Sequence, residues 1–430
     1  MKIQNVKGGY DFLPKQQKIR NYINDILRKT FEEYGYLPVE TPILCYYDIL
    51  SGKYDENNDI LKEIYKLNDQ GNRKLGLRYD LTVPFAKLIA LNKNQIKLPF
   101  KRYEISKVFR DGPVKVGRDR EFTQCDVDVV GLENQMIEAE LISLYVNAFN
   151  KLKIDIIIKY NSRNLMNGLV LESGIEKKLI SKTITIIDKM NKINEEELIN
   201  YFLEIGLNTK QIKTLLNYFK MNLKTISETF KNTTNTLLIK GITELQELEK
   251  YLQQLNLQKY CKFDSTLARG QDYYTGNVFE AYEKNLKLTS SIGGGGRYDR
   301  MITDFINDGN TYPAVGISFG LTSIYELLKD QEEETSSIDI FIIPINTPMD
   351  SLKLANDLRK LNIKIDIEME NKKLKKSLDY ANKEKIKYVI ILGEDEIKNN
   401  KINLKDMINN KNYEIDLKNL KQIKNILDNN

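Results

Sequence analysis

The sequence predicts an α+β fold with two domains, the larger with a helical insertion and the smaller of α/β type. Two strand-like segments flank a basic loop between residues 100 and 131, as in a pair of adjacent strands. Leucine, isoleucine, lysine and glutamate then recur at helical spacing over residues 165–257. Strand and helix patterns alternate over residues 338–430, which indicates a mostly parallel sheet. We expect the first domain to span residues 1–327.

Length and composition suit a globular protein. A chain of 430 residues, 41% of them hydrophobic, buries a sizeable core in two or three domains. The net charge of +5 is mild, so any contact with a nucleic acid has to come from local basic patches. The start of the chain does not resemble a signal peptide, and no apolar run approaches the ~20 residues of a membrane span. We expect a cytoplasmic protein without a membrane partner.

The usage of histidine and cysteine narrows the chemistry. Histidine is absent, which excludes serine-histidine and cysteine-histidine nucleophile pairs and histidine metal ligands. Cys45, Cys125 and Cys261 lack metal or redox spacing and are expected to be small buried side chains. Phosphoryl or nucleotidyl transfer remains compatible, because arginine, lysine and metal ions perform it by position and charge. A bias toward AT-rich codons explains the missing histidine equally well.

The N-terminal region predicts a long helix followed by an edge strand. Asp11-Phe12-Leu13-Pro14 places proline in a first helical turn, and apolar residues keep helical spacing as far as Tyr34. Gly35 then ends the helix. Two prolines confine the extended segment 37–44 to a sheet edge or an interface. An edge strand after a long helix suits the contact surface of a dimer.

Asp80 and Thr82 are the first candidate site residues. They lie in an extended stretch that ends at Pro84, where they share one strand face. This face offers a carboxylate and a hydroxyl, although a surface strand is an equally good interpretation.

The strands around the basic loop carry polar residues on one face. Gln124, Asp126 and Asp128 alternate with apolar neighbours on the return strand. Burying such groups without partners costs roughly 2 kcal/mol or more each, which favours a pocket for a polar ligand. Three arginines of the loop are candidate clamps for phosphate. They are Arg110, Arg118 and Arg120. The alternative is a solvated basic hairpin.

The stretch from Leu267 to Glu280 resembles a binding surface. A turn at Thr275-Gly276-Asn277 separates aromatic residues from a β-rich segment. The stretch offers donors for a carboxylate or phosphate, an acceptor for an ammonium group and a flat phenolic wall. These groups belong to Arg269, Asp272, Tyr273 and Tyr274. A hairpin with a surface ion pair and two core tyrosines is the alternative.

Two later segments carry further signals. The glycine run 293–296 lacks the ending of a P-loop and is expected to let backbone approach backbone or a ligand closely. In the C-terminal domain, the lysines between positions 372 and 376 form a basic edge suited to an RNA backbone.

Taken together, these motifs resemble the histidyl-tRNA synthetases, a family of class II aminoacyl-tRNA synthetases. Lys7 to Pro14 is similar to the family's opening, and Glu40-Thr41-Pro42 to motif 1. Phe109 through Gln124 is similar to motif 2, and Leu267 through Glu280 to the family's own signature. The C-terminal domain resembles the anticodon-binding module. The resemblance implies an antiparallel catalytic sheet, a homodimer, and activation of L-histidine with ATP and Mg²⁺ before transfer to tRNA(His).

The resemblance also implies roles for single residues. Asp80 and Thr82 hold the α-ammonium group of histidine, and Gln124 orients it. The imidazole is read by Asp128, Tyr273 and Tyr274. The catalytic residues are Arg110, which grips the α-phosphate, and Arg269, which bridges this phosphate and the attacking carboxylate. Further ATP contacts are expected from Arg118, Arg120 and Arg297, and no metal ligand is expected from a side chain.

Two positions depart from the family pattern. Gly112 stands where motif 2 has a glutamate, and Ser323 stands where motif 3 has an arginine. We expect Arg118, Arg120, Arg297 or Arg300 to replace the missing charge. The alternative function is a catalytically silent histidine sensor, such as the regulatory subunit of ATP phosphoribosyltransferase.

Overall fold

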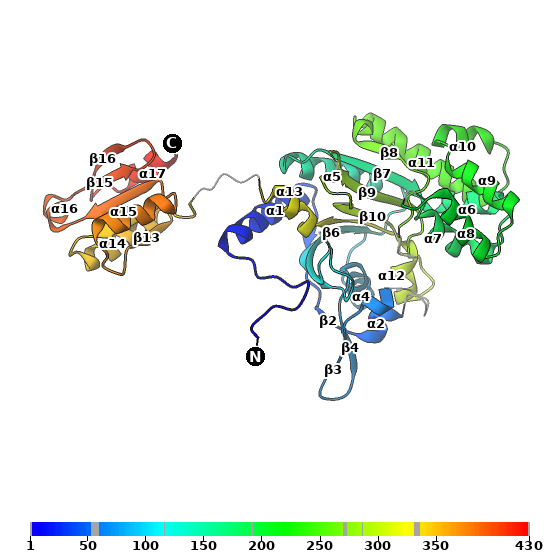
Figure 1. Ribbon diagram of the computed structural model, residues 1–430, viewed down its shortest axis with the longest axis horizontal. Helices are drawn as coiled ribbons and strands as arrows, with labels where there is room; N and C mark the ends of the chain where they lie inside the picture. Colours follow the sequence, from blue (N-terminus) through cyan, green and yellow to red (C-terminus); the bar gives the residue numbers. More distant parts are fainter. Residues whose placement is uncertain are drawn as a thin grey trace. The chain divides into compact units, whose positions relative to one another are not determined.

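The computed structural model describes residues 2–52, 60–115, 117–190, 192–269, 273–285, 287–330 and 336–428. The chain divides into two compact units, Met1–Asp330 and Gln331–Asn430 (Figure 1). Asp272, a candidate site residue, lies outside the described residues. Among the residues described, no helix combines the length and apolar character needed to cross a bilayer.

The first unit is built on a sheet with the strand order β1-β5-β6-β11-β10-β9-β7-β8. Neighbouring strands from β5 to β7 pair antiparallel, whereas the outermost strands β1 and β8 pair parallel. This arrangement confirms the expected antiparallel sheet and the edge position of the segment after the first helix. The strands are β1 (Leu37–Pro38), β5 (Phe100–Phe109), β6 (Glu121–Val130), β11 (Ala314–Gly320), β10 (Gly293–Arg297), β9 (Asn277–Glu283), β7 (Ile156–Ser162) and β8 (Cys261–Phe263).

One face of this sheet is apolar and covered by helices. Alternate residues of each strand point to the same face, and on this face Phe319 packs against Phe31 and Tyr145, with ring centroids 5.5 and 4.6 Å away. The largest hydrophobic core of the described chain lies here. The covering helices are α1 (Pro14–Glu33), α5 (Met136–Lys151) and α13 (Leu321–Leu328) (Figure 1). The opposite face of the sheet is left for polar side chains.

Smaller elements border that polar face. A three-stranded sheet has the order β2-β4-β3 and is accompanied by short helices. Helix α4 packs against α12. The elements are α2 (Tyr47–Ser51), α3 (Ile60–Glu63), β2 (Leu44–Tyr46), β3 (Lys66–Asn68), β4 (Lys74–Leu77), α4 (Thr82–Asn92) and α12 (Asp299–Ile306).

The expected helical insertion is present between β7 and β8. Its helices begin repeatedly at asparagine, as at Asn194, Asn208 and Asn235, whose side chains accept a hydrogen bond from the first turn. Gly241 lets two helices touch, because a Cβ there would lie 2.2 Å from the Leu165 nitrogen. The helices are α6 (Arg163–Glu172), α7 (Ile180–Ile187), α8 (Glu195–Glu204), α9 (Thr209–Phe219), α10 (Leu223–Thr229) and α11 (Thr236–Gln254).

The second unit is an α/β domain with the strand order β13-β12-β14-β15-β16. The sheet is mixed rather than mostly parallel. β12, β13 and β14 are parallel, but β15 and β16 form an antiparallel hairpin whose turn is held by the Asp406 carboxylate. The elements are β12 (Ile340–Pro344), α14 (Pro348–Arg359), β13 (Ile365–Ile367), α15 (Leu374–Lys383), β14 (Tyr388–Leu392), α16 (Glu394–Asn399), β15 (Lys401–Asp406), β16 (Lys411–Asp416) and α17 (Lys421–Asp428).

Candidate active site

The strand register aligns polar residues into rows on the uncovered face of the large sheet. Residues directly opposite one another on paired strands share a face. One row runs across five strands as Asp126, Ser318, Gly294, Glu280 and Lys159. A second row lies two residues away along the strands and runs as Arg102, Asp128, Gly316 and Gly296.

A small cavity of about 90 Å³ lies over one end of these rows. It brings together eight of the predicted site residues with several glycines and Ser318. The predicted residues are Asp80, Thr82, Arg110, Gln124, Asp128, Arg269, Tyr273 and Tyr274. Segments that are distant in sequence therefore converge on one polar pocket.

Asp80 and Thr82 do not share a strand face as predicted, because Thr82 begins α4 and Asp80 lies two residues before it. Oδ1 of Asp80 accepts a hydrogen bond from the Val83 amide at 3.1 Å. Its Oδ2 is buried and accepts no hydrogen bond from the described residues. Burial raises the pKa of Asp80 to about 6, against the opposing effects of the Val83 amide and Arg110. An ammonium group of a ligand would give the free oxygen a partner.

Asp128 is fixed at the opposite side of the pocket by two neighbours. Arg102 lies 2.6 Å from its Oδ2, and the hydroxyl of Tyr298 donates to its Oδ1 at 2.5 Å. Burial nevertheless raises the pKa of the Asp128 carboxyl. The Tyr298 hydroxyl gives its one proton to this carboxylate, so the pair offers acceptor lone pairs to a polar ring.

Asp126 borders the same pocket from β6, with its Oδ1 3.5 Å from the Gln124 amide nitrogen. The same nitrogen donates to the Ser318 hydroxyl at 3.0 Å. Burial raises the pKa of Asp126 to about 8, so this carboxyl is largely neutral at pH 7. Asp80 and Asp126 thus share one pocket but differ in charge at pH 7.

The glycine strands form the floor under these side chains. A Cβ on Gly316 would lie 1.9 Å from Oδ1 of Asp128, and one on Gly294 would lie 2.4 Å from Nη1 of Arg269. A Cβ on Gly296 would lie 2.9 Å from the Tyr274 ring. This packing confirms the prediction that the glycine run allows close approach.

A second, larger cavity of about 560 Å³ adjoins the first. Arg110 and Arg269 are the two described residues that border both cavities. Arg110 donates to the Tyr79 carbonyl at 3.0 Å, and its guanidinium lies 5.1 Å from the Phe122 ring centroid. Arg269 is held by Glu280 at 2.7 Å. Two oriented guanidinium groups therefore stand where the contents of the two cavities meet.

Not all predicted phosphate contacts reach this second cavity. Arg118 borders it and is paired with Glu63 at 2.8 Å, while Ser323 also borders it from the first turn of α13. Arg120 turns away and contacts the Gly112 carbonyl and Asp111.

The prediction for Arg297 is wrong. Its position in β10 places it on the helix-covered face of the sheet, and it is only 3% exposed. There its Nε lies 2.7 Å from Glu138 of α5, and its Nη1 lies 3.2 Å from Asp299. Arg300, the other candidate near the glycine run, is exposed on α12 and borders neither cavity.

Several residues of the two cavities escaped the sequence prediction. Tyr298 follows the glycine run at an even spacing from Gly294 and Gly296, a signal that would have placed it on the site face. Lys159 borders the larger cavity from β7, but its surroundings carry no motif. Its place depends on the pairing of β7 with β9 across the insertion.

An antiparallel sheet whose polar face carries an amino-acid-sized acidic pocket beside a larger arginine-bordered cavity defines the catalytic domain of a class II aminoacyl-tRNA synthetase. Residues 8–324 match the family model described as "Histidyl-tRNA synthetase", and residues 339–425 match the "Anticodon binding domain". The chain belongs to the histidyl-tRNA synthetase family.

Individual relatives agree with this assignment. The chain is 47% identical to Histidine--tRNA ligase 1 of Bacillus cereus over 95% of its length and 96% of that protein. It is 42% identical to Histidine--tRNA ligase 2 of Shouchella clausii over 94% and 96% of the two chains. The crystal structure of histidyl-tRNA synthetase from Nostoc sp. PCC 7120 matches with a TM-score of 0.84 and 28% identity, covering 99% of both chains. These names favour a ligase over the alternative of a histidine sensor.

Proposed function

We propose that this protein is a histidine–tRNA ligase that activates L-histidine with ATP and transfers it to tRNA(His). The observation that carries the proposal is the junction of the two cavities at Arg110 and Arg269. An acidic pocket on one side suits the ammonium group and ring of histidine, and the larger cavity on the other side suits a nucleotide.

The small cavity supports a division of roles around histidine. Asp80, with its free oxygen, binds the α-ammonium group together with Thr82, and Gln124 orients it. Asp128 and the tyrosines 273 and 274 bind the imidazole, and we add Tyr298 because its hydroxyl already contacts Asp128. The ring then meets an acceptor and a donor.

The junction supports the chemical step. An oxygen of the histidine carboxylate attacks the α-phosphorus of ATP, the bond from this phosphorus to the bridging oxygen of the β-phosphate breaks, and the electron pair leaves with pyrophosphate. Arg110 binds the α-phosphate, and Arg269 lies between this phosphate and the carboxylate. Both guanidinium groups are oriented beforehand by Tyr79 and Glu280, so they need little rearrangement as charge develops.

Magnesium is proposed to enter with ATP as part of the substrate. Within the described ranges, no group of three or more acidic or cysteine side chains is arranged to hold a metal ion. The carboxylates of Asp264 and Glu280 in the larger cavity are already paired with Lys159 and Arg269. Mg²⁺ commonly keeps several waters and binds substrate phosphates, which is compatible with this site.

The remaining partners follow from surfaces outside the pocket. Exposed lysines at positions 372, 373, 375 and 376 suit the tRNA backbone. Exposed apolar side chains on α1, β1 and β2, namely Tyr22, Leu37 and Leu44, suit a homodimer contact. We place this activity in the cytoplasm.

Amino-acid-dependent exchange of pyrophosphate into ATP tests the proposal. We expect exchange with L-histidine and none with the other standard amino acids, followed by charging of tRNA(His). Histidine binding without any exchange would contradict the ligase and return the histidine sensor to consideration.

A further inference from the structure

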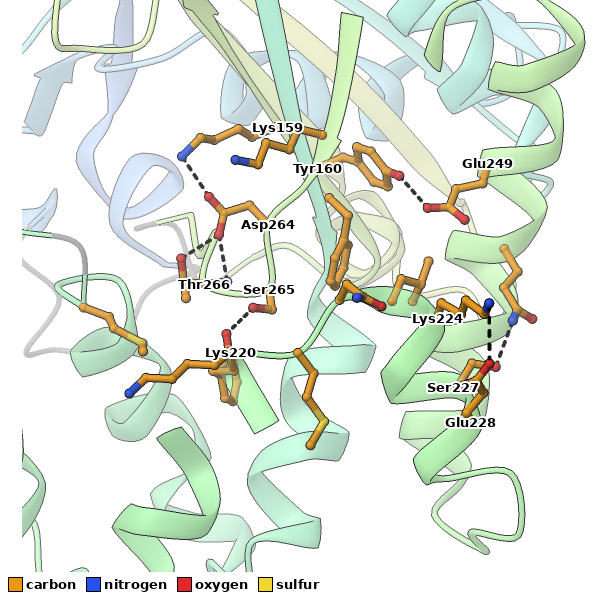
Figure 2. A pocket seen from close by; sticks show the side chains of 18 residues that line it. Lys159, Tyr160, Lys220, Lys224, Ser227, Glu228, Glu249, Asp264, Ser265 and Thr266 are labelled. Carbon is orange, nitrogen blue, oxygen red and sulfur yellow. Dashed lines mark hydrogen bonds and ion pairs between the residues drawn. The ribbon is translucent and has the colours of Figure 1, made fainter. Parts of the chain in front are cut away.

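Lys159 occupies the far end of the polar row that starts in the histidine pocket. In the strand register it lies opposite Glu280, which lies opposite Gly294, which lies opposite Ser318 of the small cavity. Adjacent strands are about 4.8 Å apart, so Lys159 starts about 10 Å beyond Gly294. Its side chain borders the larger cavity, with Nζ 5.3 Å from the Tyr282 ring centroid. The same Nζ lies 2.8 Å from Oδ2 of Asp264, an ion pair marked in Figure 2.

The stereochemistry of the proposed reaction places the leaving group on the side where Lys159 lies. In a phosphoryl transfer the attacking and leaving oxygens lie roughly in line with phosphorus. The attacking carboxylate comes from the histidine pocket, and Arg269 crosses over Gly294 between the two cavities. Pyrophosphate therefore departs on the side of Arg269 that faces away from Asp126 and Ser318. That side of the row carries Glu280 and then Lys159.

The other cations of the larger cavity are placed differently. Arg110 and Arg269 stand at the junction, and Arg118 lies on the motif 2 loop, half exposed and paired with Glu63. Lys192 belongs to the insertion, where its side chain is 64% exposed and paired with Asp188. Lys159 alone among these described cations projects from the outer part of the rigid sheet.

We propose that Lys159 binds the β- or γ-phosphate of ATP and stabilises departing pyrophosphate, supplying charge that Ser323 lacks. This inference rests on the proposed function. Without ATP, the Asp264 carboxylate binds the side-chain ammonium group of Lys159. The Asp264 carboxylate also accepts hydrogen bonds from the Thr266 amide and hydroxyl, at 3.1 and 2.6 Å. Asp264 therefore keeps partners when Lys159 turns to the phosphate, which lowers the cost of the exchange.

Lys262 provides a matched control. It lies opposite Lys159 on the neighbouring strand β8 and borders an adjoining open groove, shown in Figure 2, but not the larger cavity. Exchange kinetics and ligand binding are compared for wild type, Lys159→Met, Lys159→Arg and Lys262→Met. Loss of one charge-assisted contact predicts that Lys159→Met raises the KM for ATP and for pyrophosphate about 10- to 100-fold. The KM for histidine and the Kd for AMP stay unchanged, because neither ligand carries a β-phosphate.

Three further results would support the proposal: Lys159→Arg keeps most activity, Lys262→Met matches wild type, and Ser323→Arg partly restores Lys159→Met. Unchanged ATP and pyrophosphate constants in Lys159→Met would overturn it. An equal loss of AMP and histidine binding in Lys159→Met would also overturn it, because that pattern indicates a structural role. If the methionine variant does not fold, the same constants are measured for Lys159→Arg. A wild type without exchange would refute the ligase instead, and calorimetric binding of ATP and AMP to the same variants would then decide the role of Lys159.

Discussion

At the scale of single residues, the site works through unequal charge on similar groups. Asp80 and Asp126 are both buried acids, yet burial raises the pKa of the first to about 6 and of the second to about 8. Asp80 is therefore mostly ionised near neutrality, whereas Asp126 keeps its proton. One pocket can thus attract an ammonium group without holding a full set of repelling carboxylates.

The pKa of Asp80 predicts a pH limit for histidine binding. The ammonium group needs the ionised carboxylate, so affinity is close to full from about one pH unit above a pKa of about 6 and falls about tenfold per unit well below that pKa. The ligand's imidazole also titrates near 6.5. Calorimetric titration of wild type and Asp80→Asn from pH 5 to pH 8 separates the two effects. If both proteins have the same pH profile, Asp80 does not bind the ammonium group.

Arg269 is expected to contribute more to the reaction than to binding. Removing a preorganised donor that acts on the developing charge costs about 10²- to 10³-fold in rate, while substrate binding weakens much less. Arg269→Ala should show this pattern in rapid-quench measurements of adenylate formation. Arg120→Ala is the control, because Arg120 borders neither cavity. A near-normal rate in Arg269→Ala would contradict the assigned role.

At the scale of elements, the strands β10 and β11 show how an antiparallel sheet combines a core with a site. Alternate residues of β11 serve the two faces. Phe319 enters the helix-covered core, while Gly316 and Ser318 lie under the ligand pocket. Because these glycines have no side chains, Asp128 and Arg269 can lie directly against the strand backbone.

Two alanine substitutions on β11 test this account. Gly316→Ala places a methyl group within 1.9 Å of Asp128, so we expect exchange activity to fall at least about tenfold through displacement of that carboxylate. Gly320→Ala adds the same group at 3.4 Å from its nearest neighbour, in ordinary contact, and should keep activity. Similar activities in the two variants would show that a methyl group at position 316 fits without displacing Asp128.

At the scale of the whole molecule, the two units divide the proposed tasks. Both cavities lie entirely within Met1–Asp330, and the described lysine-rich helix α15 lies in Gln331–Asn430. Each unit has hydrophobic core clusters of its own. We therefore expect histidine activation to be a property of the first unit.

Truncation after Asp330 tests this division. We expect histidine-dependent exchange to stay within a few-fold of wild type, while charging of tRNA(His) falls by about tenfold or more because phosphate contacts are lost. Circular dichroism checks that the truncated chain is folded. Unchanged charging kinetics would show that the second unit contributes little to tRNA binding.

The sequence predicted those parts of the molecule that depend on local pattern. The polar face of β6 and the helical insertion follow from short segments, and so does the grouping of Asp80, Arg110 and Arg269 around one cavity, through the resemblance of their motifs. Arg297 was misplaced because its partner, Glu138, is distant in sequence and lies on the other face of the sheet. Lys159 was missed because its position depends on a strand pairing that spans the whole insertion. Pairings of this kind leave little trace in either strand alone.

The glycine floor also limits how the pocket can be redesigned. A pocket lined by large side chains is enlarged by trimming them, but Gly294, Gly296 and Gly316 have nothing left to remove. Any replacement at these positions fills space that Arg269, Tyr274 and Asp128 already occupy. A variant that accepts a bulkier amino acid would have to change the walls, such as Tyr273 or Tyr298, and would give up the contacts proposed here for the imidazole. If variants are selected for activity with a bulkier amino acid, we therefore expect substitutions at Tyr273 or Tyr298 and none at the three glycines.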